Sequence, residues 1–354
     1  MKGEIKNLIM VWLSVITSIC FCYFIVSKIP KGKLRLFSLL PILVLFTILP
    51  LYLSFSLLLL PTFITAGCIT WLANFKLLLF AYDRGPLVSC DPPKSLLHFI
   101  FIACLPIEIK QNKKLSSSTR PPNFPLILTL PIKVLILAIC VNVYDYKDHL
   151  HPKVMMLSYC CLVYLIMDMI LFLLNPITRA MLRIELESPS DEPYLSTSLQ
   201  DFWGRRWNLK VTSILRDTVY KPLTSSLQSV IGVKWAPLLA VFAVFLVSGL
   251  MHEFLFYIIS RVSPTWEVTC FFVLHGVCVT GELVFKRLLT DKWQLHWAVS
   301  APLTVGFVIV TATWLFLPPI VRSGTIFRAM EECKILINFV TETPKFVGEV
   351  LPIY

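Results

Sequence analysis

The chain has 354 residues, of which 56% are hydrophobic and 15% are charged, and its mean hydropathy is +0.76. Soluble domains carry about 25% charged residues, so the composition excludes a soluble globular protein and indicates an integral membrane protein. The formal net charge is +11. Because the basic residues lie between apolar runs, they indicate an anionic lipid surface and orientation signals rather than a nucleic-acid partner.

Eight apolar runs follow one another along the chain, each close to the roughly 20 residues that a transmembrane helix needs. They cover residues 8–26, 36–59, 61–80, 124–143, 154–174, 235–259, 266–285 and 298–320. We expect the first to be an uncleaved helix rather than a signal peptide, because basic residues follow it and no small-residue cleavage site does. We therefore expect an all-α, polytopic fold of about eight spans, forming a single membrane domain over residues 1–354.

The segments between these spans differ in character. The apolar stretch 96–107 is too short to cross a bilayer, so we expect a short re-entrant or interfacial helix there. The loop 110–120 is basic and rich in Ser, which favours a flexible cytosolic loop. Asp168, inside a span, either lines a polar cavity or pairs with a neighbouring helix. Residues 321–354 hold no long apolar run and are expected to form a soluble tail.

The longest polar region, residues 176–233, mixes charged and apolar side chains as amphipathic helices on a membrane do. Within it, residues 202–208 have the sequence FWGRRWN. Arg205 and Arg206 can hold a carboxylate or phosphate through paired hydrogen bonds. The alternative is an interface helix anchored by Trp, with its arginines on lipid headgroups. The amide of Asn208 can donate a hydrogen bond to an oxygen atom.

A second polar feature lies inside the apolar run 235–259, where Ser248 is followed one helical turn later by His252 and then by Glu253. Ionisable groups are strongly disfavoured in lipid, so such a residue is a functional-site hypothesis by default. The alternative is a histidine that is satisfied by a helix neighbour or placed in the headgroup layer.

The cysteines and the other histidines predict neither a disulfide framework nor a metal site. Most of the 11 cysteines lie inside apolar runs, and no CxxC or paired Cys/His spacing occurs. His149 and His151 share a short loop, but no further ligand type repeats beside them.

Taken together, the FWGRRWN box and the later apolar-embedded SGLMHE at residues 248–253 resemble the signature of the membrane-bound O-acyltransferase family. More narrowly, they are similar to the plant wax synthases, which join the fatty acyl group of acyl-CoA to a long-chain alcohol. Residues 71–80, 192–203 and 266–278 also look like this subfamily. Length and span number fit as well, so the resemblance covers nearly the whole chain.

The resemblance implies an intramembrane reaction chamber with a site built on His252 and the Trp207–Asn208 pair. An alcohol is a poor nucleophile until a base takes its proton, and histidine suits this step near neutral pH. We therefore expect His252 to be the general base. Asn208 is the candidate donor to the tetrahedral oxyanion, although it can instead position His252 or the CoA moiety. No covalent acyl-enzyme is required.

Further residues are expected to bind substrate. They are Trp203, Arg205, Arg206, Trp207, Ser248, Glu253 and His275. The two arginines are candidates for the CoA head, with lipid contact as the alternative. Ser248 is better placed than Glu253 to orient His252, because adjacent helical residues do not face each other. His275 either lines the chamber or is the base in place of His252.

The implied partners are acyl-CoA and a fatty alcohol, with a sterol as the alternative acceptor, and the implied location is the endoplasmic reticulum membrane. Acyl-CoA is a substrate, and no cofactor, metal ion or nucleic acid is implied. Two alternative functions of another class are a membrane transporter and a non-catalytic scaffold. A transporter predicts inverted repeats or paired broken helices, and we find none in the sequence.

Overall fold

The structure, a computed structural model, describes residues 2–53, 59–88, 95–106, 126–182, 190–288 and 295–350. Across these ranges the chain is built of helices and contains no strand, which confirms the expected all-α fold. The expected cytosolic loop 110–120 lies outside the described residues.

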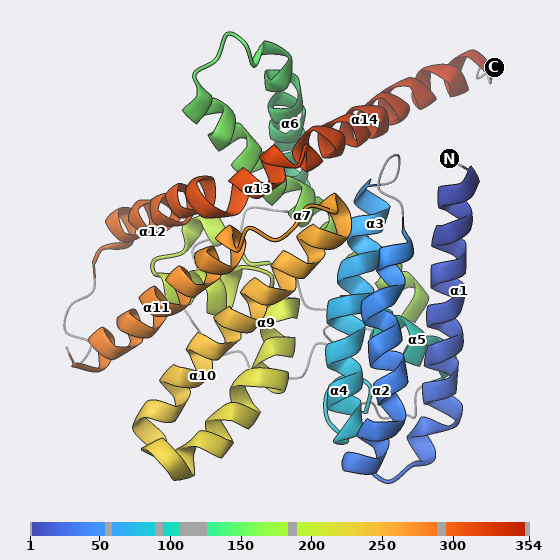
Figure 1. Ribbon diagram of the computed structural model, residues 1–354. Coiled ribbons are helices and arrows are strands. Elements are labelled where there is room, and N and C mark those ends of the chain that lie inside the picture. Colours follow the sequence, from blue (N-terminus) through green and yellow to red (C-terminus); the bar gives the residue numbers. More distant parts are fainter. Residues whose placement is uncertain are drawn as a thin grey trace.

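The first five helices form one bundle, drawn in blue and teal in Figure 1. They are α1 (Lys2–Phe24), α2 (Lys33–Ile48), α3 (Leu59–Ala66), α4 (Asn74–Ala81) and α5 (Leu96–Cys104). A π-helical turn, Gly67–Ala73, joins α3 to α4. Val15, Phe46 and Ile69 are fully buried in one apolar cluster of this bundle. Close van der Waals packing of this kind is what holds helices together in lipid.

The remaining helices surround a second packed region (green to red in Figure 1). They are α6 (Leu126–Val143), α7 (Pro152–Leu182), α8 (Leu199–Asp201), α9 (Leu209–Leu215), α10 (Lys221–Ser260), α11 (Glu267–Leu288), α12 (Trp297–Thr311), α13 (Leu317–Arg322) and α14 (Thr325–Val350). Three π-helical turns, Phe202–Arg206, Arg216–Tyr220 and Ala312–Phe316, lie between them. Among the described elements, α10 and α11 pack against each other most extensively.

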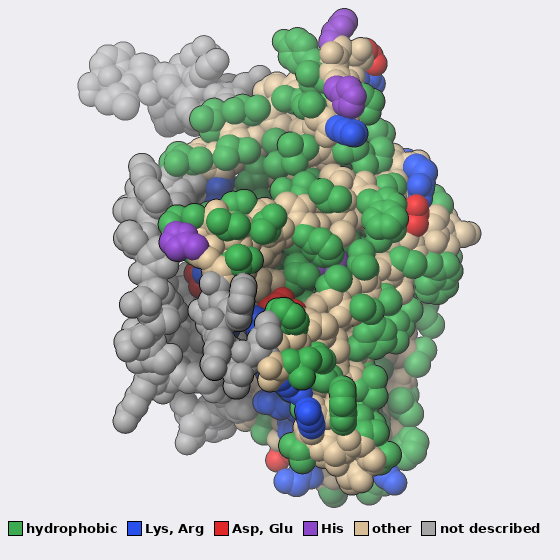
Figure 2. Space-filling model, turned by 90° about the vertical axis from the view of Figure 1, so that its left-hand side faces the viewer, with side chains coloured by type: hydrophobic (Ala, Val, Ile, Leu, Met, Phe, Trp, Pro, Cys, Tyr) green, Lys and Arg blue, Asp and Glu red, His purple; other side chains and the backbone are tan. Residues whose placement is uncertain are grey.

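Seven helical stretches in the described ranges are long and apolar enough to cross a membrane. They are Gly3–Lys28, Lys33–Tyr52, Leu59–Ala81, Pro152–Phe172, Leu209–Ser260, Glu267–Leu288 and Trp297–Arg322. They confirm seven of the eight expected spans, whereas the eighth, 124–143, is helical as α6 but is not one of the seven. Hydrophobic side chains cover much of the face in Figure 2, with most visible Lys and Arg at its lower and upper margins.

The stretch Leu209–Ser260 is a helical hairpin rather than one rod. A straight helix of its 52 residues would be about 78 Å long, more than twice the thickness of a bilayer core. Gly232 breaks the helix with φ 83° and ψ 163°, a conformation that glycine adopts without a steric penalty. Figure 1 shows the two arms meeting at the lower end of the molecule. The end of the expected amphipathic region 176–233 therefore forms the first arm of this hairpin.

Helix α14 packs into the protein, although we expected residues 321–354 to form a soluble tail. Ile326, Met330 and Cys333 are buried in a cluster with residues of α7 and α13. The carboxylate of Glu332 accepts hydrogen bonds from the backbone N–H groups of Leu59 and Leu60, the latter at 2.9 Å. These N–H groups stand at the start of α3 as the structure describes it, where backbone N–H groups usually lack a partner within the helix, so Glu332 caps it.

Two charges inside the fold have partners within it. The Oδ2 atom of Asp168 lies 2.8 Å from Nζ of Lys133, so Asp168 pairs with the neighbouring helix α6. Lys76 is fully buried and donates to the carbonyl oxygens of Ile102, at 2.6 Å, and Leu105 at the end of α5. Carbonyl groups at a helix C-terminus carry partial negative charge and stabilise the ammonium group there.

Candidate active site

A cavity of about 540 Å³ lies between α3, α7, the segment around α9, α10, α11 and the α13–α14 corner. Both His252 and Asn208 line it, together with Trp203, Trp207 and Ser248. The lining is otherwise mostly apolar, and the volume falls in the usual range of small-molecule sites. The structure therefore brings the two halves of the sequence motif, which belong to different helical elements, to one chamber.

The hydrogen bond made by His252 defines its neutral tautomer. Its Nδ1 atom lies 2.8 Å from the backbone carbonyl oxygen of Ser248, one turn earlier in α10. A carbonyl oxygen only accepts hydrogen bonds, so Nδ1 carries the proton, and the lone pair of Nε2 has no hydrogen bond to any residue in the described ranges. The ring stacks on Phe272 with centroids 4.5 Å apart and meets the Trp71 ring edge-on at 5.0 Å. The arrangement presents an imidazole that is able to accept a proton.

Glu253 points away from the cavity toward α11. Its Oε1 atom accepts a hydrogen bond of 3.1 Å from the backbone N–H of Thr269, in the first turn of α11, and the side chain is buried. A Cβ atom at the nearby Gly249 would lie 3.1 Å from Cα of Thr269, so glycine permits this close approach of α10 and α11. Glu253 and Gly249 thus fix the helix pair that carries His252.

Asn208 is the N-cap of α9 and lies in the left-handed region, with φ 40°. Asn tolerates this conformation better than most residues, and it is a preferred helix N-cap. Its Oδ1 atom accepts from the backbone N–H of Val211 at 3.4 Å. Nδ2 has no hydrogen bond to any described residue, so this donor is available to a ligand in the cavity.

His275 is fully buried and lies outside the cavity lining. The indole Nε1–H of Trp203 donates to His275 Nδ1 at 3.0 Å, and His275 Nε2 lies 2.9 Å from Oγ1 of Thr311. An indole only donates, so Nδ1 is the acceptor and Nε2–H donates to the hydroxyl. With both nitrogens occupied, His275 holds Trp203 in the cavity wall and has no lone pair for a substrate.

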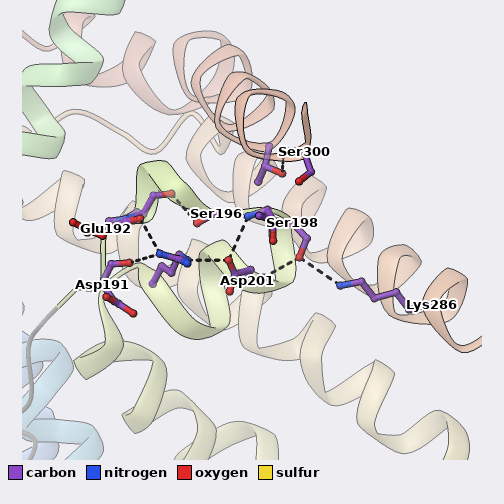
Figure 3. A network of polar contacts seen from close by, with 11 residues as sticks. Asp191, Glu192, Ser196, Ser198, Asp201, Lys286 and Ser300 are labelled. Carbon is purple, nitrogen blue, oxygen red and sulfur yellow. Dashed lines mark hydrogen bonds and ion pairs between the residues drawn. The ribbon is translucent and has the colours of Figure 1, made fainter. Parts of the chain in front are cut away.

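Arg206 is held by a polar network on the loop before α9. Its Nε lies 2.9 Å from Oδ2 of Asp201, and its Nη1 donates to the carbonyl oxygens of Asp191 (3.1 Å) and Glu192 (3.3 Å). Figure 3 shows Asp191, Glu192 and Asp201 gathered together, and the network continues through a serine to Lys286 of α11. Arg206 thus organises this loop, and it does not line the cavity.

The cationic groups at the cavity are different arginines from those expected. Arg205 is exposed and does not line it. Among the described lining residues, Arg216 and Arg287 alone are exposed, so they mark where the cavity opens. Arg287 also donates to the carbonyl oxygen of Lys234 at 2.7 Å. Arg287 lies in the last turn of α11, where basic side chains of a membrane span reach the interface. This position was the sequence signal that could have pointed to Arg287 as a residue at the cavity opening.

Comparison with known proteins shows the family to which this chain belongs. A family model described as the membrane bound O-acyl transferase family matches residues 187–274, a range that holds both Asn208 and His252. A probable long-chain-alcohol O-fatty-acyltransferase 1 of Arabidopsis thaliana is 42% identical over 350 residues, covering 96% of this chain and 98% of the relative.

Two further relatives are as similar. The long-chain-alcohol O-fatty-acyltransferase of Simmondsia chinensis is 41% identical over 343 residues, with 96% of each chain covered. An acyl-CoA–sterol O-acyltransferase 1 of Arabidopsis thaliana is 42% identical over 339 residues, which covers 95% of this chain and 96% of the relative. This confirms the resemblance found in the sequence: the chain belongs to the membrane-bound O-acyltransferase family and is a multi-pass membrane O-acyltransferase.

Proposed function

We propose that this protein transfers a fatty acyl group from acyl-CoA to the hydroxyl of a long-chain alcohol and so forms a wax ester. The observation that carries the proposal is the free Nε2 lone pair of His252 in an apolar membrane cavity that Asn208 also lines. The names of the similar plant proteins support the choice of an alcohol acceptor.

The reaction assigns one task to each polar group. Nε2 of His252 takes the proton of the alcohol as its oxygen attacks the thioester carbonyl carbon. The carbonyl oxygen becomes an oxyanion, to which Nδ2 of Asn208 donates a hydrogen bond. When the carbon–sulfur bond breaks, the CoA thiolate receives the proton from His252, and the ester is left. The apolar walls keep water away from the thioester, which limits hydrolysis.

The opening of the cavity supports a position for the CoA moiety. Phosphate groups are bound well by guanidinium, and the two exposed lining residues are Arg216 and Arg287. We therefore propose these arginines as the CoA contacts, in place of Arg205 and Arg206.

Replacing Arg216 with Gln is expected to raise the KM for acyl-CoA about two- to fivefold, because exposed charge pairs contribute up to about 1 kcal/mol. The effect should shrink as salt is added, since salt screens exposed charges. The matched change Arg205→Gln is expected to leave KM unaltered. A larger KM effect at Arg205 than at Arg216 would favour the original sequence hypothesis instead.

A sterol acceptor is the second candidate, because a sterol O-acyltransferase is as similar to this chain as the alcohol acyltransferases are. Labelled acyl-CoA is supplied with a fatty alcohol or a sterol to membranes that express the protein, and the two esters are quantified. The endoplasmic reticulum fraction is the expected source of activity, because acyl-CoA and fatty alcohols meet there. We expect wax ester to dominate, and exclusive formation of steryl ester refutes the alcohol acceptor.

A further inference from the structure

One end of the cavity is a buried apolar wall made by three helices that are distant in sequence. Leu59 of α3, Ile259 of α10 and Ala329 of α14 line the cavity, and each has at most 8% of its surface exposed. The three side chains belong to one apolar cluster. This end therefore contrasts with the arginine-lined opening, and it can receive only an apolar group.

The wall is fixed in place by a polar anchor. Glu332 follows Ala329 by three residues, so both lie on neighbouring positions of one α14 face. The carboxylate of Glu332 accepts hydrogen bonds from the N–H groups of Leu59 and Leu60, which ties α14 to the start of α3. A helix held in this way presents Ala329 to the cavity at a defined depth.

The distance from His252 to this apolar wall can be derived from α10, because the same helix carries His252 and Ile259. Seven residues of α-helix span about 10 Å. An alkyl chain whose reacting end lies at His252 therefore meets the wall about 10 Å further on. Ala329 is the smallest side chain of the three, so its size decides how much room the end of the chain has.

We propose that Ala329 limits the length of the alkyl chain that this end of the cavity accepts, an inference that rests on the proposed ester synthesis. The chain belongs to either the acyl group or the alcohol, since both are unbranched and apolar. A larger side chain at position 329 shortens the compartment and excludes the terminal methylene groups of long substrates.

The test compares Ala329→Leu with Ala298→Leu, the same change at an exposed alanine of α12 that does not line the cavity. Ester formation is measured with acyl-CoA of increasing length and one alcohol, and then with alcohols of increasing length and one acyl-CoA. In Ala329→Leu we expect kcat/KM for long chains to fall relative to short ones, about fourfold for each methylene that no longer fits. The series in which this occurs identifies the chain, and Ala298→Leu should match the unaltered protein.

A second variant keeps the test decisive if Ala329→Leu folds poorly. Ile259→Ala enlarges the same end, and we expect its preference to move to longer chains in the same series. Misfolding lowers activity for every chain and does not produce a gain for long ones. Unchanged length preference in Ile259→Ala, with ester still formed, overturns the role of this wall. Absence of ester from the unaltered protein refutes the proposed function instead.

Discussion

Replacing His252 with alanine is expected to lower kcat for ester formation by about 100- to 10,000-fold, the usual contribution of a positioned general base. The structure gives the reason. The Nδ1–H group of His252 donates a hydrogen bond to the backbone carbonyl oxygen of Ser248, so the Nε2 lone pair faces a chamber with few other polar groups. Alanine removes that lone pair, and neither nitrogen of His275 is free to replace it.

The matched control is His149→Ala, which removes an exposed imidazole from a loop that does not line the cavity. Protein amount in the membrane is measured for both variants, and initial rates are compared at saturating acyl-CoA. We expect His149→Ala to retain its rate. If His252→Ala is as fast as the control at equal expression, His252 is not the base.

Asn208→Asp is expected to lower kcat by about 100- to 1,000-fold, the usual effect of removing one oxyanion donor. Aspartate keeps the Oδ1 acceptor that caps α9 and tolerates the left-handed conformation of residue 208, so the fold should persist. It lacks the N–H donor, and its negative charge opposes an oxyanion. The variant therefore separates the catalytic role of Asn208 from its role as a helix cap.

Asn208→Ala serves as the comparison, because it removes the donor and also the cap, which is worth about 1 kcal/mol. Asn142→Asp, at an exposed position outside the cavity, controls for the chemical change itself. Thermal stability and initial rate are measured for all three. Near-normal turnover in Asn208→Asp, with loss of stability in Asn208→Ala, would show that the residue acts as a cap alone.

Most of the helices were predictable from the sequence, and so were the two central residues of the candidate site, whose catalytic roles stay predictions. Long apolar runs determine spans because lipid offers no partner to an exposed backbone, which makes the helix the simple solution. His252 was predictable for the same reason, since an ionisable residue in such a run is costly. Asn208 was found through the family resemblance. The structure then shows that both residues line one cavity.

The arginines that line the cavity differ from those expected because helix phase could not be derived from the sequence, and the proposed KM comparison tests which of them bind CoA. Two π-helical turns, Phe202–Arg206 and Arg216–Tyr220, lie in the stretch that carries them. A π turn inserts an extra residue into the 3.6-residue period and rotates every side chain that follows. Counting along a regular helix therefore does not predict that Arg216 lines the cavity and Arg205 does not.

The hairpin and the packing of α14 were missed for two other reasons. Gly232 lies near the end of the polar region 176–233, and a single glycine is tolerated in a helix, so it gave no clear sign of a reversal. In α14 the buried residues Ile326, Ala329, Met330 and Cys333 follow the i, i+3, i+4, i+7 spacing of an amphipathic helix. That pattern was visible in the sequence, but a search for long apolar runs does not detect it.

The hydrogen bonds from α3 to Glu332 also have a consequence for biosynthesis. Leu59 and Leu60 leave the ribosome early, whereas the carboxylate that caps them is encoded more than two hundred residues later. Until α14 has been made, the start of α3 lacks this cap and the cavity lacks Ala329 and its neighbours. The nascent chain therefore acquires a complete fatty-chain compartment only late in translation, after its first membrane spans have already been synthesised.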